Sequence, residues 1–104
     1  FQYFLLGNIA DVYVLQEKYT QAIPLLLLDL EKSETQRKII NKAHVYKALA
    51  TSYIGLGDLL NGRQYLDSSQ FLFEETGSVE WISNNYKLYA EYYYFDCFAS
   101  TSSN

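Results

Sequence analysis

The chain has 104 residues, a formal net charge of −4, and a composition that is 49% hydrophobic and 17% aromatic. This apolar content is ample for a packed core and excludes a disordered chain. The acidic balance argues against a nucleic-acid surface, which needs a dense basic stripe, and the basic stretch from Arg37 to Lys47 is sparse.

Other function classes are excluded by the residues that are missing. Cys97 is the single cysteine, so the chain forms no internal disulfide and lacks the ligand spacings of a zinc site. No apolar run approaches the roughly 18 residues of a membrane span, so we expect no membrane insertion. One unpaired thiol fits either a cytoplasmic or a periplasmic protein, which leaves the localisation unknown. The chain starts at Phe1 inside an apolar pattern and has no methionine, so we expect a fragment of a longer protein.

The hydrophobic pattern predicts an all-α chain of five helices, followed by a polar tail at 99–104 that should fray. The helices are expected at about 2–16, 19–32, 35–56, 59–76 and 79–98. Ser33 to Gln36 has the form of a capping box for the third helix. Asp58, behind a glycine, is a good N-cap for the fourth, and Gly77-Ser78 begins the last.

Three of these segments align at a constant offset of 40 residues, beginning at Leu6, Tyr46 and Tyr86. In each, a large residue is followed after three positions by another, then directly by alanine, and three positions later by tyrosine. These spacings place the four residues on one helix face. The alanine and tyrosine columns are Ala10, Ala50, Ala90 and Tyr13, Tyr53, Tyr93.

A second helix follows the first two of these segments. Ala22 and Gly62 occupy the same column in the two second helices, again 40 residues apart, and both are small. Small residues let two helices approach closely, so we expect each pair to pack tightly. The repeat domain is therefore expected over 1–98, with repeat 1 at about 3–33, repeat 2 at about 34–77 and a half repeat at about 78–98.

The second copy resembles the tetratricopeptide repeat, through Ala50, Tyr53, Gly57-Asp58-Leu59 and Gly62. The first copy has Glu17-Lys18 where the pattern has Gly-Asp, and the third departs after Tyr93. The resemblance implies an α-α superhelix, a solenoid of about two and a half helix-turn-helix repeats. A 40-residue period exceeds the usual 34 or so, and such extended repeats look like those of bacterial sensor kinases and regulators.

The resemblance also implies a binding face, because solenoids of this type use the concave wall lined by the first helix of each repeat. The residues expected on that wall are Asn8, Asp11, His44, Lys47, Thr51, Asn84, Lys87 and Glu91. Lys47 and Lys87 share a column, so they could lie side by side and suit a carboxylate, such as a peptide C-terminus or an acidic side chain. A plain solvated surface is the alternative interpretation of both lysines.

The implied function is a protein- or peptide-binding scaffold, as the sensing or docking part of a larger bacterial signalling or regulatory protein. The alternative is a structural spacer or oligomerisation segment without a selective groove. Nothing indicates an enzyme or a cofactor, since the chain has no phosphate loop, metal-ligand spacing or nucleophile motif. A lone histidine, His44, has no catalytic partner in the pattern.

The last predicted helix carries aromatic rings on all faces, which is unexpected for a terminal helix with one wet side. The rings belong to Tyr89, Tyr92, Tyr93, Tyr94, Phe95 and Phe98. Either further repeats cover this helix in a longer protein, or the helix is itself a docking site. In the isolated chain we expect a tendency to self-association through it.

Overall fold

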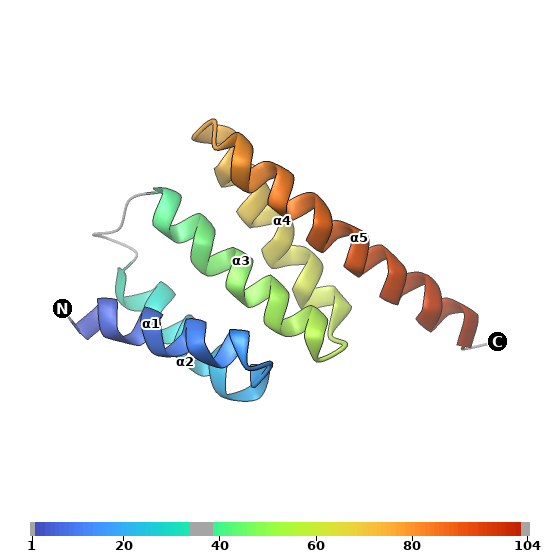
Figure 1. Cartoon of the computed structure of the whole chain (residues 1–104), viewed down its shortest axis with the longest axis horizontal. Helices are drawn as coiled ribbons and strands as arrows, with labels where there is room; N and C mark the ends of the chain where they lie inside the picture. The colour runs from blue at the N-terminus through green and yellow to red at the C-terminus, as the bar shows by residue number, and fades with distance from the viewer. Residues whose placement is uncertain (1, 34–38, 103–104) are drawn as a thin grey trace.

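A computed structural model describes residues 2–33 and 39–102, and side chains from Ile9 to Glu31 and from Ile39 to Cys97. Within those residues the chain is entirely helical, which confirms the predicted fold class (Figure 1). The helices are α1 (Gln2–Leu15), α2 (Tyr19–Ser33), α3 (Ile39–Gly55), α4 (Leu59–Glu75) and α5 (Val79–Ser102). They pack as a helical bundle with α3 between α1 and α2 on one side and α4 and α5 on the other. None of these helices is both long and apolar enough to cross a membrane.

Two helix ends differ from the expectation. The last helix continues to Ser102, so residues 99–102 are helical and not a fraying tail, because the run from Ala99 to Ser102 contains no glycine or proline to break it. Ser33 is the last residue of α2, and the rest of the expected capping box lies outside the described residues. The N-cap of α4 is confirmed, since Asp58 Oδ1 accepts a hydrogen bond from the Asn61 N–H at 3.3 Å.

The turns after α1, α3 and α4 share one backbone geometry. In each, one residue has a left-handed φ, namely Glu17 at 60°, Gly57 at 84° and Gly77 at 68°. The next residue donates its N–H to the carbonyl five positions back, with N···O distances of 2.8 Å for Lys18 to Tyr13, 2.9 Å for Asp58 to Tyr53 and 3.0 Å for Ser78 to Phe73. This is the Schellman motif, in which glycine is favoured at the left-handed position. The first turn builds the same motif with a glutamate.

The core consists of two buried clusters that meet at α3. The first joins α1, α2 and α3 through Ala10, Ala22, Leu26, Val45 and Leu49. The second joins α3, α4 and α5 through Ala50, Ile54, Leu66 and Leu88. The consecutive residues Leu49 and Ala50 are both fully buried, one in each cluster. Because α3 buries two different sides in this way, it connects α1 and α2 to α4 and α5.

In two helix pairs, α3/α4 and α1/α2, small residues of one helix interlock with large residues of the other. A Cβ atom added to Gly62 would lie 2.6 Å from Cγ1 of Ile54, so α3 and α4 pack closely there, as expected for that column. Leu66 follows Gly62 by four positions on α4, and Ala50 precedes Ile54 by four positions on α3. Leu66 and Ala50 both belong to the second cluster. The α1/α2 pair repeats the arrangement with Ala22 and Val14, and with Leu26 and Ala10. Both helices of a pair therefore carry a small residue followed four positions later by a large one.

The odd-numbered helices lie together along one side of the bundle. Backbone of α3 contacts both α1 and α5, whereas no Cα atoms of α2 and α4 come within 8 Å of each other in the part of the chain that is described. We call the surface of α1, α3 and α5 the odd-helix face. It is the surface that carries the residues predicted to bind a partner.

Replacing Glu17 with glycine should stabilise the chain by about 1 kcal/mol, because glycine adopts a left-handed φ without the steric cost that a Cβ atom brings. Glu17→Ala, which keeps the Cβ atom, is the matched control and should give no such gain. Urea unfolding followed by circular dichroism measures both. Equal stability of the two variants would show that Glu17 is not strained.

Replacing Ala50 with tryptophan should destabilise the chain by about 3 kcal/mol, because the fully buried Ala50 has no room for a larger side chain. Gln64→Trp places the same ring on the exposed side of α4 and should change the unfolding free energy by less than about 0.5 kcal/mol. A neutral Ala50→Trp variant would contradict the packing of the α3/α4 pair.

Candidate binding face

The predicted site residues are distributed over α1, α3 and α5, the helices of the odd-helix face. Asn8 lies outside the residues whose side chains are described. Four of the others are brought together in two groups, Asp11 with His44 and Lys47 with Glu91. Asn84 and Lys87 are exposed on α5. The expected Lys47–Lys87 pair therefore stays a prediction, while the charge that acts on Lys47 is the carboxylate of Glu91.

A pocket of about 210 Å³ opens between α1, α2 and α3. Buried side chains form its floor and exposed ones its rim, and the lining residues are Asp11, Leu26, Asp29, Asn41, His44, Val45 and Ala48. Asp29 is fully buried, whereas Asp11 and Asn41 lie at the exposed rim. The polar part of the lining is thus two carboxylates, one amide and one imidazole, and the apolar part is aliphatic.

His44 connects this pocket to the other half of the molecule. Its ring makes edge-to-face contacts with Phe73 of α4 and Trp81 of α5, with ring centroids 5.1 and 4.4 Å apart. Partial burial lowers the pKa of His44 and the charge of Lys47 lowers it further, while Asp11 acts in the opposite direction. The neutral imidazole is therefore favoured in the folded chain.

Lys47 lies one turn beyond His44 and is also partly buried. Burial lowers its pKa, and the carboxylate of Glu91 on α5 acts to raise it. Thr51, one turn further, donates its hydroxyl hydrogen bond to the Lys47 carbonyl at 2.9 Å, so that donor is used within α3. Asp11, His44, Lys47 and Glu91 therefore form a row of interacting charged and titratable groups across α1, α3 and α5.

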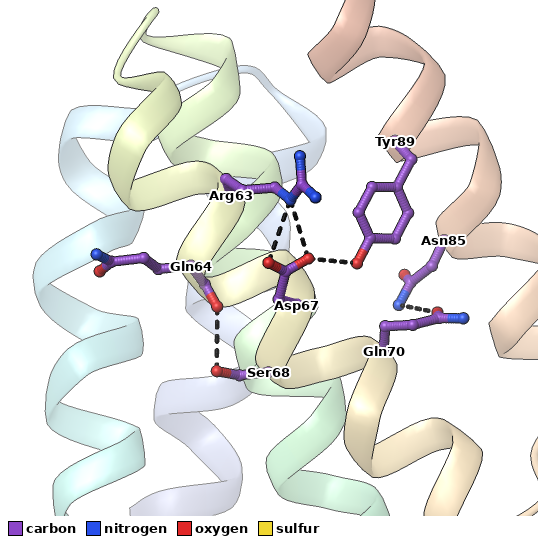
Figure 2. Close-up of polar contacts among 7 residues, drawn as sticks. All are labelled: Arg63, Gln64, Asp67, Ser68, Gln70, Asn85 and Tyr89. Carbon is purple, nitrogen blue, oxygen red and sulfur yellow. Dashed lines mark hydrogen bonds and ion pairs between the residues drawn. The ribbon is translucent and has the colours of Figure 1, made fainter.

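Sequence reasoning missed a polar cluster that joins α4 to α5 (Figure 2). Arg63 Nε donates to Asp67 Oδ1 and Oδ2 at 3.0 and 3.1 Å, and the Tyr89 hydroxyl donates to Asp67 Oδ1 at 2.6 Å. Partial burial and then the hydrogen bond to Asp67 raise the pKa of Tyr89 well above its ordinary value. The Arg63–Asp67 spacing of four positions on a helix was a visible signal, but the third partner comes from another helix.

The guanidinium of Arg63 is also surrounded by aromatic rings. Its Cζ lies 5.6, 5.2 and 5.4 Å from the ring centroids of Tyr89, Tyr92 and Tyr93. Such a group of rings resembles a cage for a cationic ligand. Here the chain's own arginine occupies it, so we interpret this cluster as a clamp between α4 and α5 and not as a ligand site.

A second missed cluster lies at the same helix interface. Asn85 is fully buried, and its Nδ2 donates to Ser69 Oγ and Gln70 Oε1, both at 3.2 Å. Asn85 occupies the column of Val45, which packs in the apolar first cluster. The α4/α5 interface is therefore more polar than its α2/α3 equivalent. The neighbouring Asn84, not Asn85, was the predicted site residue, because one position along a helix rotates a side chain by about 100°.

No group of three or more histidine, cysteine or acidic side chains that could hold a metal ion occurs where side chains are described. Comparison with known proteins gave no matching family model, no matching curated protein and no matching solved structure. The resemblance to tetratricopeptide repeats therefore stays a prediction from the sequence pattern. The helical, repeat-like fold itself is observed directly.

The lowered pKa of His44 predicts a pH dependence of stability. The unfolded chain, with an ordinary histidine pKa of 6.5, binds more protons than the folded chain at mildly acidic pH. Stability is therefore fully present above the unfolded pKa and is lost as the pH falls through it towards the folded pKa. Between about pH 7.5 and about pH 5.5, the parent chain should lose more unfolding free energy than His44→Gln. Urea unfolding at both pH values measures this, and equal losses in the two proteins would contradict it.

Proposed function

We propose that this chain is a peptide- or protein-binding module that holds a partner segment along the odd-helix face. The observation that carries this proposal is the row of groups from the acidic pocket at Asp11, across His44 and Lys47, to Glu91. These groups come from α1, α3 and α5, and the charged ones, Asp11, Lys47 and Glu91, alternate in sign. A partner running across the three helices would meet each of them in turn.

The pocket is suited to one side chain of such a partner. Its volume of about 210 Å³ is below the roughly 300–1,000 Å³ of pockets that hold drug-sized ligands. Carboxylates at Asp11 and Asp29 favour a cationic head group, and the aliphatic lining at Leu26 and Val45 suits a methylene stem. Lysine or arginine has both parts. The pocket therefore favours a basic residue of the partner.

The other charged groups of the row determine which charges are favoured on the next residues of the partner. Lys47 favours an acidic residue, and Glu91 favours a second basic one. The complementary partner segment therefore has a basic, an acidic and a second basic residue, in this order from α1 to α5. As part of the same proposal, the module is the sensing or docking part of a larger bacterial signalling or regulatory protein, and that wider role is supported by the repeat resemblance alone.

The test is selection of a random displayed peptide library on the whole chain, followed by affinity measurement of the enriched peptides by fluorescence anisotropy. Enrichment of basic–acidic–basic peptides is expected. Asp11→Lys should weaken their binding by about tenfold or more, which corresponds to about 1.4 kcal/mol. Lys47→Glu should shift the selected middle residue from acidic to basic. Glu75→Lys, at the exposed end of α4, has the same charge change as Asp11→Lys and should leave the affinity unchanged.

Two outcomes would contradict the proposal. Selection without any enriched charge pattern would favour the alternative function, a structural spacer or oligomerisation segment without a selective groove. Enriched peptides that bind Asp11→Lys and Lys47→Glu as well as the parent chain would show binding at another surface. Circular dichroism of each variant checks that helicity is kept.

A further inference from the structure

The face of α5 that corresponds to the covered faces of α1 and α3 is exposed. Ala10 and Ala50 are fully buried, whereas Ala90, in the same column, is exposed. The tyrosine column shows the same change, because Tyr13 and Tyr53 are partly buried and Tyr93 is 52% exposed. Tyr94, in the column of Val14 and Ile54, is 67% exposed. This α5 face, formed by Tyr86, Ala90, Tyr93 and Tyr94, is a packing surface with no helix on it within the described residues.

The covered faces of α1 and α3 show which kind of helix packs on such a surface. On α3, the small residue Ala50 and the large residue Ile54 are four positions apart, and α4 meets them with Leu66 and Gly62. The two helices are antiparallel, so large meets small twice. Each helix of the pair has the same motif, a small residue followed four positions later by a large one. A motif of this kind is complementary to an antiparallel copy of itself.

Ala90 and Tyr94 repeat that motif on α5. We propose that two copies of this chain associate through their α5 faces, antiparallel about a twofold axis, with Ala90 of each against Tyr94 of the other. A twofold interface of this type uses one surface patch twice and closes at the dimer. In this dimer, α5 of the second copy packs on α5 of the first as α4 packs on α3. The phenol ring fits because its apolar body packs on the alanine while its hydroxyl reaches water at the edge.

The surrounding side chains favour the same arrangement. Tyr86 is 60% exposed and lies one turn before Ala90 on the same side of α5, so aromatic surface continues from the Ala90–Tyr94 pair. Arg63 contacts the ring of Tyr93 and thereby holds it in place before association. A contiguous exposed aromatic surface of this kind marks an interaction site in soluble proteins.

Sedimentation equilibrium of the whole chain over a wide concentration range tests the proposal. The parent chain should show a monomer–dimer equilibrium with no larger species. Ala90→Leu places a large residue against Tyr94 of the other copy and should weaken dimerisation by about tenfold or more. The double variant Ala90→Leu with Tyr94→Ala reverses the order of small and large, so the introduced leucine again meets a small residue. It should recover dimerisation. Gln64→Glu, on the exposed side of α4, should dimerise like the parent.

Three results would overturn the proposal. A parent chain that stays monomeric at all concentrations excludes the dimer, and binding of a peptide with the α4 sequence, residues 57–78, to that monomer would assign the α5 face to a helix of another protein. Dimerisation that is insensitive to Ala90→Leu would place the interface elsewhere, for example at the exposed Val12 and Leu15 of α1. Loss of dimerisation in both the single and the double variant would exclude the Ala90–Tyr94 register. Circular dichroism of each variant confirms that it is folded.

Discussion

The structure depends on the meeting of a small residue with a large one where two helices cross. Gly62 against Ile54 brings α3 and α4 so close that an added methyl group would clash. Close approach lets side chains interlock without voids, and interiors packed in this way tolerate little change in volume. Because the same motif recurs at an offset of 40 residues, the α1/α2 pair forms in the same manner. The helix α3, which buries Leu49 in one cluster and Ala50 in the other, then joins the α1/α2 pair to α4 and α5.

The central position of α3 also determines the candidate binding face. Residues of α3 that do not face the core lie between α1 and α5, so His44 and Lys47 meet groups from both neighbours. His44 lines the pocket and at the same time packs against Phe73 and Trp81. A ligand that changes the ring of His44 would therefore act on the packing of α4 and α5. The pocket and the packing of α4 against α5 are therefore connected through this one side chain.

The two interfaces of α5 differ in chemistry, and this difference separates their roles. Towards α4 it makes polar contacts, which are buried from Asn85 to Ser69 and Gln70 and exposed from Tyr89 to Asp67. Buried polar groups stabilise only when their hydrogen bonds are made, so they define one alignment of α5 on α4. Away from α4 the helix exposes Ala90, Tyr93 and Tyr94. The polar side aligns α5 with α4, and the aromatic side is the one through which we propose that two copies associate.

The sequence by itself determined the helices, the 40-residue repeat and the small-residue columns, because these follow from local spacing and side-chain size. It also placed the candidate residues on α1, α3 and α5. Only the tertiary structure decided which of them meet. It placed the carboxylate of Glu91 where it acts on Lys47, and it brought Asp29 of α2 into the pocket. Arg63, Asp67 and Tyr89 were likewise invisible as a cluster, because their contact depends on how α5 is rotated against α4. Helical periodicity assigns a residue to a face, whereas contacts between helices depend on their relative rotation and alignment, which packing of the whole chain fixes.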